Sequence, residues 1–284
     1  MYPLHSIINS KFNKELRKEF FGNNLIPAGK KFELILFLVL LGLLYVAIEL
    51  SRRGIKVPKI RELAALQAIP EVVGRAAELN RPVHISTGIG GLSDEWAPMT
   101  IAGMAILRNV VEYCGKLGVP VKYFCIRAHM LPAMQDLVRS GYVKGGRPEI
   151  YSEDMVEFIG DGQQRALMAA MMGYITREKP AANILLGATF YETYISLGCG
   201  AVQGCLQIAG TPRLYYQGIL VALADYPLIG QELYAAAAKV TGNPPDLGSI
   251  AGQDYNTVVC LILIVISTIL ATIGSALWNM LLKW

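Results

Sequence analysis

The stretch Val83-His-Ile-Ser-Thr-Gly-Ile-Gly-Gly91 predicts a buried strand that ends in a glycine-rich turn. A helical apolar pattern follows over residues 98–117, so strand, turn and helix form one unit. The unit recurs, because residues 119–126 predict a second strand and residues 131–140 a second helix. Strands that alternate with helices are typical of a mostly parallel sheet that helices cover on both faces. We therefore expect a Rossmann-like three-layer α/β domain.

The rest of this domain follows the same alternation. We expect helices over residues 163–178 and 228–241, and strands over residues 182–186, 201–208 and 218–224. The last predicted helix is followed by a polar link that ends near Tyr255. This link is expected to return the chain from the domain to a membrane.

Two apolar runs flank the domain. Residues 34–48 form one run, and residues 256–282 contain no charged side chain. About 20 apolar residues of helix cross the hydrocarbon core, so both runs predict transmembrane helices, with an interfacial helix as the alternative for the first. The expected segments are a polar or amphipathic N-terminal segment 1–31, a transmembrane helix 32–50, a juxtamembrane helical linker 51–81, the α/β domain 82–255 and a transmembrane helix 256–282. Residues 11–21 predict either an amphipathic helix on the bilayer or a disordered tail.

Basic residues gather at the edges of the predicted spans. Residues 1–31 carry six Lys or Arg and two Glu, and residues 51–62 carry five Lys or Arg and one Glu. This placement indicates lipid head groups as a partner, and we expect no nucleic acid. The near balance of basic residues across the first span leaves the orientation open.

The cysteines favour one orientation. Cys114 and Cys125 fall in apolar patterns and are expected to be buried free thiols, which are at home in a reducing compartment. We therefore expect a two-pass protein of the cell membrane, with its α/β domain in the cytoplasm.

The glycine turn is the first candidate binding site. Free backbone amides at this position of an α/β fold cradle phosphates, which favours an anion or a nucleotide as ligand. The spacing is not G-x-G-x-x-G, so a tight turn with positive φ at Gly90 is the alternative. The candidate residues of the turn are Thr87, Gly88, Gly90, Gly91 and Ser93.

Three further polar residues are candidates. Arg127 and His129 follow the end of the second predicted strand and together suit a carboxylate or a phosphate; an exposed loop pair is the alternative. Asp225 ends another predicted strand, where it either caps the following helix or joins the site. His84 alternates within a strand, so we interpret it as a packed or hydrogen-bonded side chain.

The second apolar run carries small residues on one helical face. They are Ser267, Ala271, Gly274 and Ser275. Small residues let helix backbones approach closely in lipid, so this face predicts packing against the first span or against a second copy. Incidental composition is the alternative.

Three later motifs carry a resemblance to a known family. They are Gln207-Ile-Ala-Gly-Thr211, Tyr226-Pro-Leu-Ile-Gly-Gln-Glu-Leu-Tyr-Ala-Ala236 and Leu247-Gly-Ser-Ile-Ala-Gly-Gln-Asp254. With them and the glycine turn, residues 82–282 resemble an uncharacterised prokaryotic membrane-protein family described only as a domain of unknown function. The resemblance implies membrane anchoring and an α/β domain, and it implies no activity, substrate or catalytic residue.

Recognisable catalytic motifs are missing from the sequence. It contains no H-E-x-x-H, no G-x-S-x-G and no G-x-x-x-x-G-K-[ST]. We therefore expect a non-enzymatic, membrane-anchored scaffold or structural protein that self-assembles through its α/β domain and transmembrane helices. The alternative is a membrane-tethered sensor or binding module for a nucleotide or small anion, and an enzyme whose site these motifs miss is a third possibility. The expected partners are the lipid bilayer, copies of the chain and other membrane proteins, with no cofactor and no metal.

Overall fold

The structure of the protein is a computed structural model that describes residues 30–272. The chain forms two compact units, one made of Met1–Val57 with Ala251–Trp284 and the other of Pro58–Ile250. The amphipathic helix predicted over residues 11–21 lies outside the described residues.

The second unit is built on a parallel sheet with the strand order β3-β2-β1-β4-β5-β6. The strands are β1 (Val83–Gly88), β2 (Val121–Cys125), β3 (Val156–Phe158), β4 (Ala182–Ala188), β5 (Leu206–Thr211) and β6 (Tyr226–Ile229). Every residue of the central strand β4 is buried, as expected where helices cover both faces of a sheet. The α/β fold that the alternation of strands and helices predicts is confirmed.

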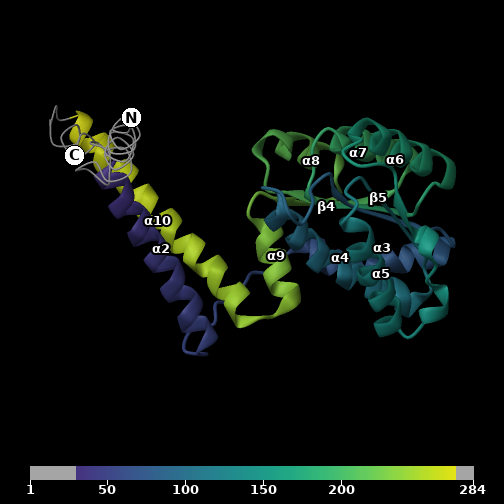
Figure 1. The fold of residues 1–284 in the computed structure, drawn as a ribbon, viewed down its shortest axis with the longest axis horizontal. Helices are drawn as coiled ribbons and strands as arrows, with labels where there is room; N and C mark the ends of the chain where they lie inside the picture. The colour runs from purple at the N-terminus through teal and green to yellow at the C-terminus, as the bar shows by residue number, and fades with distance from the viewer. Residues whose placement is uncertain (1–29, 273–284) are drawn as a thin grey trace, which may run out of the picture. The chain divides into compact units, whose positions relative to one another are not determined.

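Helices form a layer on each face of the sheet (Figure 1). One layer packs its apolar side chains into the larger core and contains α3 (Ala64–Leu79), α4 (Ala97–Leu117), α5 (Met130–Gly145) and α9 (Glu232–Thr241). The other layer contains α6 (Gln164–Glu178), α7 (Glu192–Gln203) and α8 (Gln217–Leu223). Three short 3-10 turns lie at Pro148–Ile150, Glu153–Met155 and Leu214–Tyr216. The three-layer arrangement matches the prediction.

Two of the predicted strands are wrong. Residues 201–208 are divided between the end of α7, which reaches Gln203, and β5, which begins at Leu206. Residues 218–224 lie almost entirely in α8, and the last strand β6 begins before the helix predicted over residues 228–241 and overlaps its start. The physical reason is that short apolar runs have no periodicity that separates a strand from a buried helix.

The polar link predicted after the last helix of the domain is helical. Helix α10 (Pro244–Thr272) runs continuously through it. Prolines suit the first turn of a helix, where the missing backbone N–H is not needed. Asp246 in that turn accepts a hydrogen bond from Thr241 Oγ1 at 2.9 Å. A polar composition therefore marks the solvated start of a helix here and not a break between helices.

The first unit contains the two apolar helices. Helix α2 (Lys31–Arg52) and helix α10 are each long and apolar enough to cross a membrane. A Cβ added at Gly252 of α10 would lie 2.7 Å from Leu44 Cδ1 and 3.1 Å from Leu44 Cα, so a glycine allows these helices to touch. Ala47, which is buried, faces the same glycine. Close approach through a small residue thus occurs at Gly252.

The structure describes only part of the small-residue face predicted on α10. Ser267 is half-buried and Ala271 is exposed. Gly274 and Ser275 lie outside the described residues. Packing through this face stays a prediction.

A ladder of polar side chains crosses the centre of the sheet. His84, Asn183 and Gln207 are register partners on β1, β4 and β5. Asn183 Oδ1 lies 2.8 Å from His84 Nδ1, and Asn183 Nδ2 donates to Gln207 Oε1 at 3.0 Å. Burial lowers the pKa of His84 to about 4, against the opposing effect of its bond to Asn183. His84 is therefore a packed, hydrogen-bonded, neutral side chain, as its place in the strand predicts.

Candidate functional site at the carboxyl edge of the sheet

The strand order reverses its direction between β1 and β4. In open parallel sheets, ligands bind outside the carboxyl ends of the strands at such a switch point. Around the switch point, the loops that leave this edge begin after Gly88, Cys125, Ala188 and Thr211. Any binding site of the domain is therefore sought first among the residues of these four loops.

The glycine turn after β1 is confined by the chain beside it. Gly88 has a φ of +79°, and a Cβ added there would lie 2.2 Å from the carbonyl oxygen of Ala188. Gly90 has no positive φ, so the prediction that its φ is positive is wrong. Gly90 is instead required by space, because its Cβ would lie 2.4 Å from Thr100 Oγ1 and 2.5 Å from Ala188 Cβ. The residue of this turn with a left-handed backbone is therefore Gly88 and not Gly90.

The amides of this turn already have acceptors within the protein. Ile89 N donates to the Ala188 carbonyl at 3.1 Å, and Gly91 N donates to Asp94 Oδ2 at 2.8 Å. Leu92 N donates to His129 Nε2 at 3.0 Å. A phosphate cradle needs free amides, and the carboxylate of Asp94 occupies the place where an anion would accept them. The phosphate site predicted on the turn stays a prediction that this geometry does not favour.

Several predicted residues nevertheless meet around Asp94. Arg127 Nη2 lies 4.0 Å from Asp94 Oδ2, and a Cβ at Gly91 would lie 2.5 Å from His129 Nε2. The loops after β1 and β2 therefore converge, as adjacent parallel strands require. Their polar groups bind one another.

Three other predicted residues are scattered. Thr87 is buried, and its hydroxyl lies 2.6 Å from the Tyr123 hydroxyl. Ser93 is exposed. Asp225 accepts a hydrogen bond from Gln207 N at 2.7 Å, at the amino end of β5 and thus at the opposite edge of the sheet. Its expected role as a helix cap is wrong, because strand β6 separates it from α9.

The loop after β4 and the first residues of α7 hold polar groups that are not among the candidate residues. Glu192 is fully buried, and its carboxyl group accepts hydrogen bonds from Phe190 N and Gln164 Nε2, each at 2.9 Å. Burial raises the pKa of Glu192, while these hydrogen bonds oppose the shift. Thr189 and Thr193 are also fully buried, and their hydroxyls have no partner within residues 30–272. Unpartnered hydroxyls in a buried site are costly, so contacts within the described residues do not account for these two groups.

The loop after β5 contributes a cation to the same region. The guanidinium carbon of Arg213 lies 3.7 Å from the centre of the Phe190 ring and 6.0 Å from that of Tyr216. Arg213 is half-buried, its Nε has no hydrogen-bond partner, and no carboxylate of the described chain lies within ion-pair distance. A guanidinium that packs over an aromatic ring keeps its donors in a restricted orientation, which suits a carboxylate or a phosphate.

Aromatic rings join the loops across the switch point. The Trp96 ring, from the loop after β1, meets the Phe190 ring, from the loop after β4, edge-on at 4.8 Å. The site therefore combines a cation, buried hydroxyls and an apolar wall. Among residues 30–272, no group of three or more His, Cys, Asp or Glu side chains is placed to hold a metal ion.

Comparison with known proteins places the chain in a family. The model of a domain of unknown function, DUF6754, matches residues 22–282. The chain belongs to the DUF6754 family. No curated protein and no solved structure matches it. The expected resemblance of residues 82–282 to a domain of unknown function is confirmed, and the DUF6754 match also takes in helix α2.

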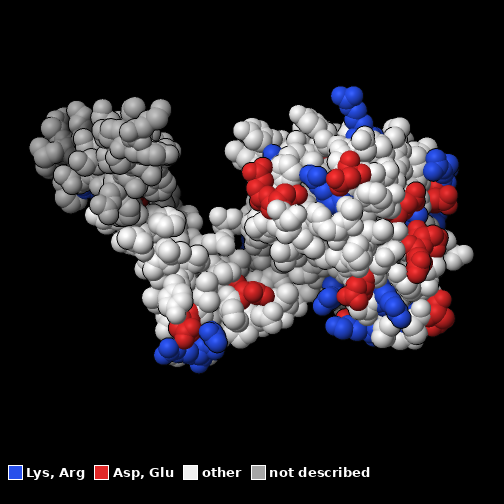
Figure 2. All heavy atoms as spheres, in the orientation of Figure 1, with Lys and Arg blue, Asp and Glu red and all other residues white. Residues whose placement is uncertain are grey.

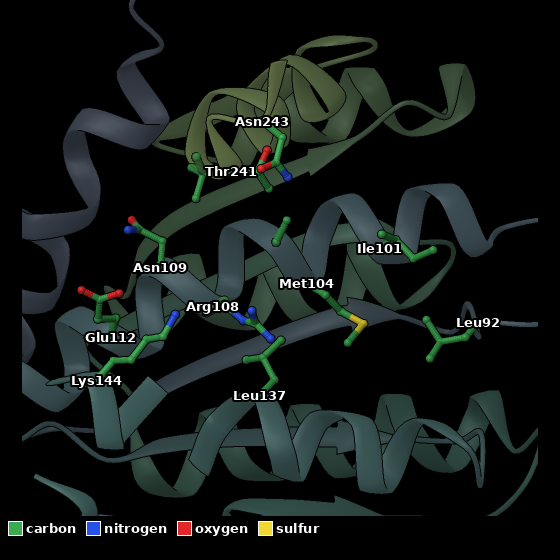
Figure 3. A pocket seen from close by; sticks show the side chains of 12 residues that line it. Leu92, Ile101, Met104, Arg108, Asn109, Glu112, Leu137, Lys144, Thr241 and Asn243 are labelled. Atoms are coloured by element: carbon green, nitrogen blue, oxygen red, sulfur yellow. The ribbon is translucent and has the colours of Figure 1, made fainter. Parts of the chain in front are cut away.

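The DUF6754 chain also has a groove of about 500 Å³ between α4, α5 and the end of α9 (Figure 3). Its lining includes Ile101, Met104, Arg108, Asn109, Leu137 and Lys144. The sequence motifs do not indicate this groove, because its residues are spread over three helices.

Proposed function

We propose that the protein is a membrane-anchored binding module, or sensor, whose α/β domain holds a small ligand with a phosphate or carboxylate group, such as a nucleotide. The observation that carries this proposal is Arg213, a half-buried cation without a carboxylate partner in the described chain. Burying an unmatched charge is costly, so an anionic ligand that supplies the counter-charge would stabilise the site.

The surrounding groups suit such a ligand. The unpartnered hydroxyls of Thr189 and Thr193 would donate to its oxygens, and the rings of Trp96 and Phe190 would pack against an apolar or aromatic part. The proposed ligand site therefore lies at the loops after β4 and β5, and not at the glycine turn that the sequence favours.

The variant Arg213→Gln tests the proposal. We expect at least one phosphate or carboxylate compound to raise the Tm of the full-length protein in a thermal-shift screen of nucleotides, inorganic phosphate and dicarboxylates. Because a hydrogen bond to a charged group contributes about 1.5–3 kcal/mol, Arg213→Gln should weaken that ligand about 10- to 100-fold. Arg177→Gln, which removes an exposed cation from α6, should bind as the wild type does. If no anion shifts the Tm, or if both variants bind equally, the binding-module proposal fails.

We further propose that α2 and α10 cross the cell membrane and that the α/β domain lies in the cytoplasm, with lipid as a partner and no nucleic acid. The domain's cysteines are free, as suits a reducing compartment. Lys or Arg and Asp or Glu intermingle over the face of the domain that Figure 2 shows. An impermeant thiol reagent applied to intact cells should not label a cysteine introduced at the exposed Arg147.

A self-assembling scaffold is the second candidate function, and an exposed aromatic surface favours it. Tyr191, Leu214 and Tyr215 are 62%, 80% and 84% exposed. Tyr191 and Tyr194 both pack edge-on against the buried Tyr216, at 6.4 and 5.8 Å between ring centres. Contiguous exposed aromatic residues are typical of protein interfaces, and a second anchored copy is the partner that is always nearby. Other membrane proteins are the alternative partners.

The double variant Leu214→Asp/Tyr215→Asp tests self-assembly. We expect light-scattering mass of the wild type in a mild detergent to exceed that of a monomer, and the double variant to be monomeric because charges replace the apolar contact. Val143→Asp alters an exposed apolar residue on α5 and should leave the mass unchanged. A monomeric wild type across several mild detergents would contradict the scaffold.

A further inference from the structure

The groove between α4, α5 and the end of α9 changes its chemistry along its length. The outward residues of α4 follow the helical spacing of one face and are Ile101, Met104, Ala105, Arg108, Asn109 and Glu112. The first three are apolar and the last three are polar. Leu137 and Lys144 of α5 repeat the same order. Helices α4 and α5 pack closely near their carboxyl ends, where Gly115 faces Gly145, so the two polar ends coincide.

Figure 3 shows the result of this alignment. Arg108, Glu112 and Lys144 gather at one end of the groove, and Leu92, Ile101 and Met104 lie toward the other. Ile101 is 55% exposed, so the apolar end is open to a ligand. A groove with one charged end and one apolar end is complementary to a molecule that has a charged head and an apolar chain.

The charged end carries a net positive charge. Glu112 pairs with Lys116 at 2.8 Å, whereas Arg108 and Lys144 form no ion pair with any described residue. Asn109 adds an amide group at this end, and Asn243, whose Nδ2 donates to Asp246 Oδ2 at 3.2 Å, also lines the groove. The polar end is therefore suited to one anionic group.

We infer that this groove binds an amphiphile with a hydrocarbon chain and a single anionic head, either a phosphate or a carboxylate. The chain would cover Ile101, Met104 and Leu137, and the head would lie between Arg108 and Lys144. The volume of about 500 Å³ is within the range of about 300–1,000 Å³ of sites that take small organic ligands. This inference does not rest on the proposed function, since Arg213, Thr189, Thr193, Trp96 and Phe190 do not line the groove.

Photolabelling of the full-length protein in nanodiscs of zwitterionic lipid tests the inference. The probe is dodecyl phosphate with a diazirine on its chain, and mass spectrometry locates the adducts. We expect adducts on Ile101, Met104 or Leu137. Arg108→Gln/Lys144→Gln should reduce this labelling about tenfold or more, because the head loses both counter-charges. The control Arg75→Gln/Arg139→Gln removes two exposed cations outside the groove and should label as the wild type does.

Competition separates the contributions of head and chain. Unlabelled dodecyl phosphate or laurate should displace the probe, and comparing the two identifies the preferred head. Dodecyltrimethylammonium, which has the same chain and the opposite charge, and inorganic phosphate should not displace it. Ile101→Asp, at an exposed position that tolerates a polar residue, should also lower labelling. The inference is overturned by equal labelling of Arg108→Gln/Lys144→Gln and its control, by equal competition from the cationic amphiphile, or by displacement with inorganic phosphate.

Discussion

Replacing Asn183 by leucine is expected to lower the free energy of unfolding of the α/β domain by about 3–5 kcal/mol. Asn183 accepts from Ser196 Oγ at 3.2 Å and donates to Gln207 Oε1 at 3.0 Å. It also lies 2.8 Å from His84 Nδ1. The leucine side chain has the same number and branching of heavy atoms but no polar atom, so it leaves these three buried groups without partners. Each such group costs about 1–3 kcal/mol.

Urea unfolding followed by the fluorescence of Trp96 measures this loss. The other tryptophans, Trp278 and Trp284, are replaced by phenylalanine in both proteins so that the signal reports the domain alone. The same exchange at the half-exposed Asn109 of α4 is the matched control and should change the free energy by about 0.5 kcal/mol or less. An equal effect at both positions would show that the ladder does not stabilise the sheet.

The substitution Gly88→Ala is expected to cost about 3–5 kcal/mol. A φ of +79° strains any residue with a Cβ, and this Cβ would lie 2.2 Å from the backbone oxygen of Ala188. Since neither strand can yield without disturbing the other, the alanine should loosen the pairing of β1 with β4. Both the strain and the clash act at the centre of the sheet.

The substitution Gly74→Ala is expected to have the opposite effect on stability. Gly74 lies within helix α3, and a Cβ added there meets no atom within 4 Å. Alanine should therefore stabilise the protein by up to about 1 kcal/mol through its helix propensity. The two variants are compared by the same urea unfolding. If Gly88→Ala were as stable as the wild type, the left-handed turn would not be a requirement of the fold.

The fold could be predicted because its signals are local. The run Val83–Gly88 and the helix pattern after it define one strand–turn–helix unit, and its repetition implies a parallel sheet. The signals fail at residues 218–224, where a short apolar run forms α8 and the strand is displaced to Tyr226–Ile229. Length and apolar content do not distinguish these two outcomes.

The candidate site could be predicted only on one side of the switch point. Arg127 and Gly91 meet because β1 and β2 are consecutive strands whose carboxyl ends are adjacent. Arg213 and Thr189 follow β5 and β4, which join β1 only through the strand order 3-2-1-4-5-6. Strand order is a property of long-range packing and leaves no mark in local periodicity. The strand misplaced over residues 201–208 also hid that Arg213 follows a carboxyl end.

The polar ladder has a consequence for how the chain avoids misfolding. A slip of β4 by one residue against β1 would place Ala182 or Ile184 opposite His84, which would then be buried without an acceptor. The same slip would remove the partner of Gln207 on β5. Apolar contacts alone penalise such a shift weakly, because neighbouring residues of β4 are almost all apolar and all buried. The polar ladder thus favours the native register of the central strands over shifted ones while the sheet is forming.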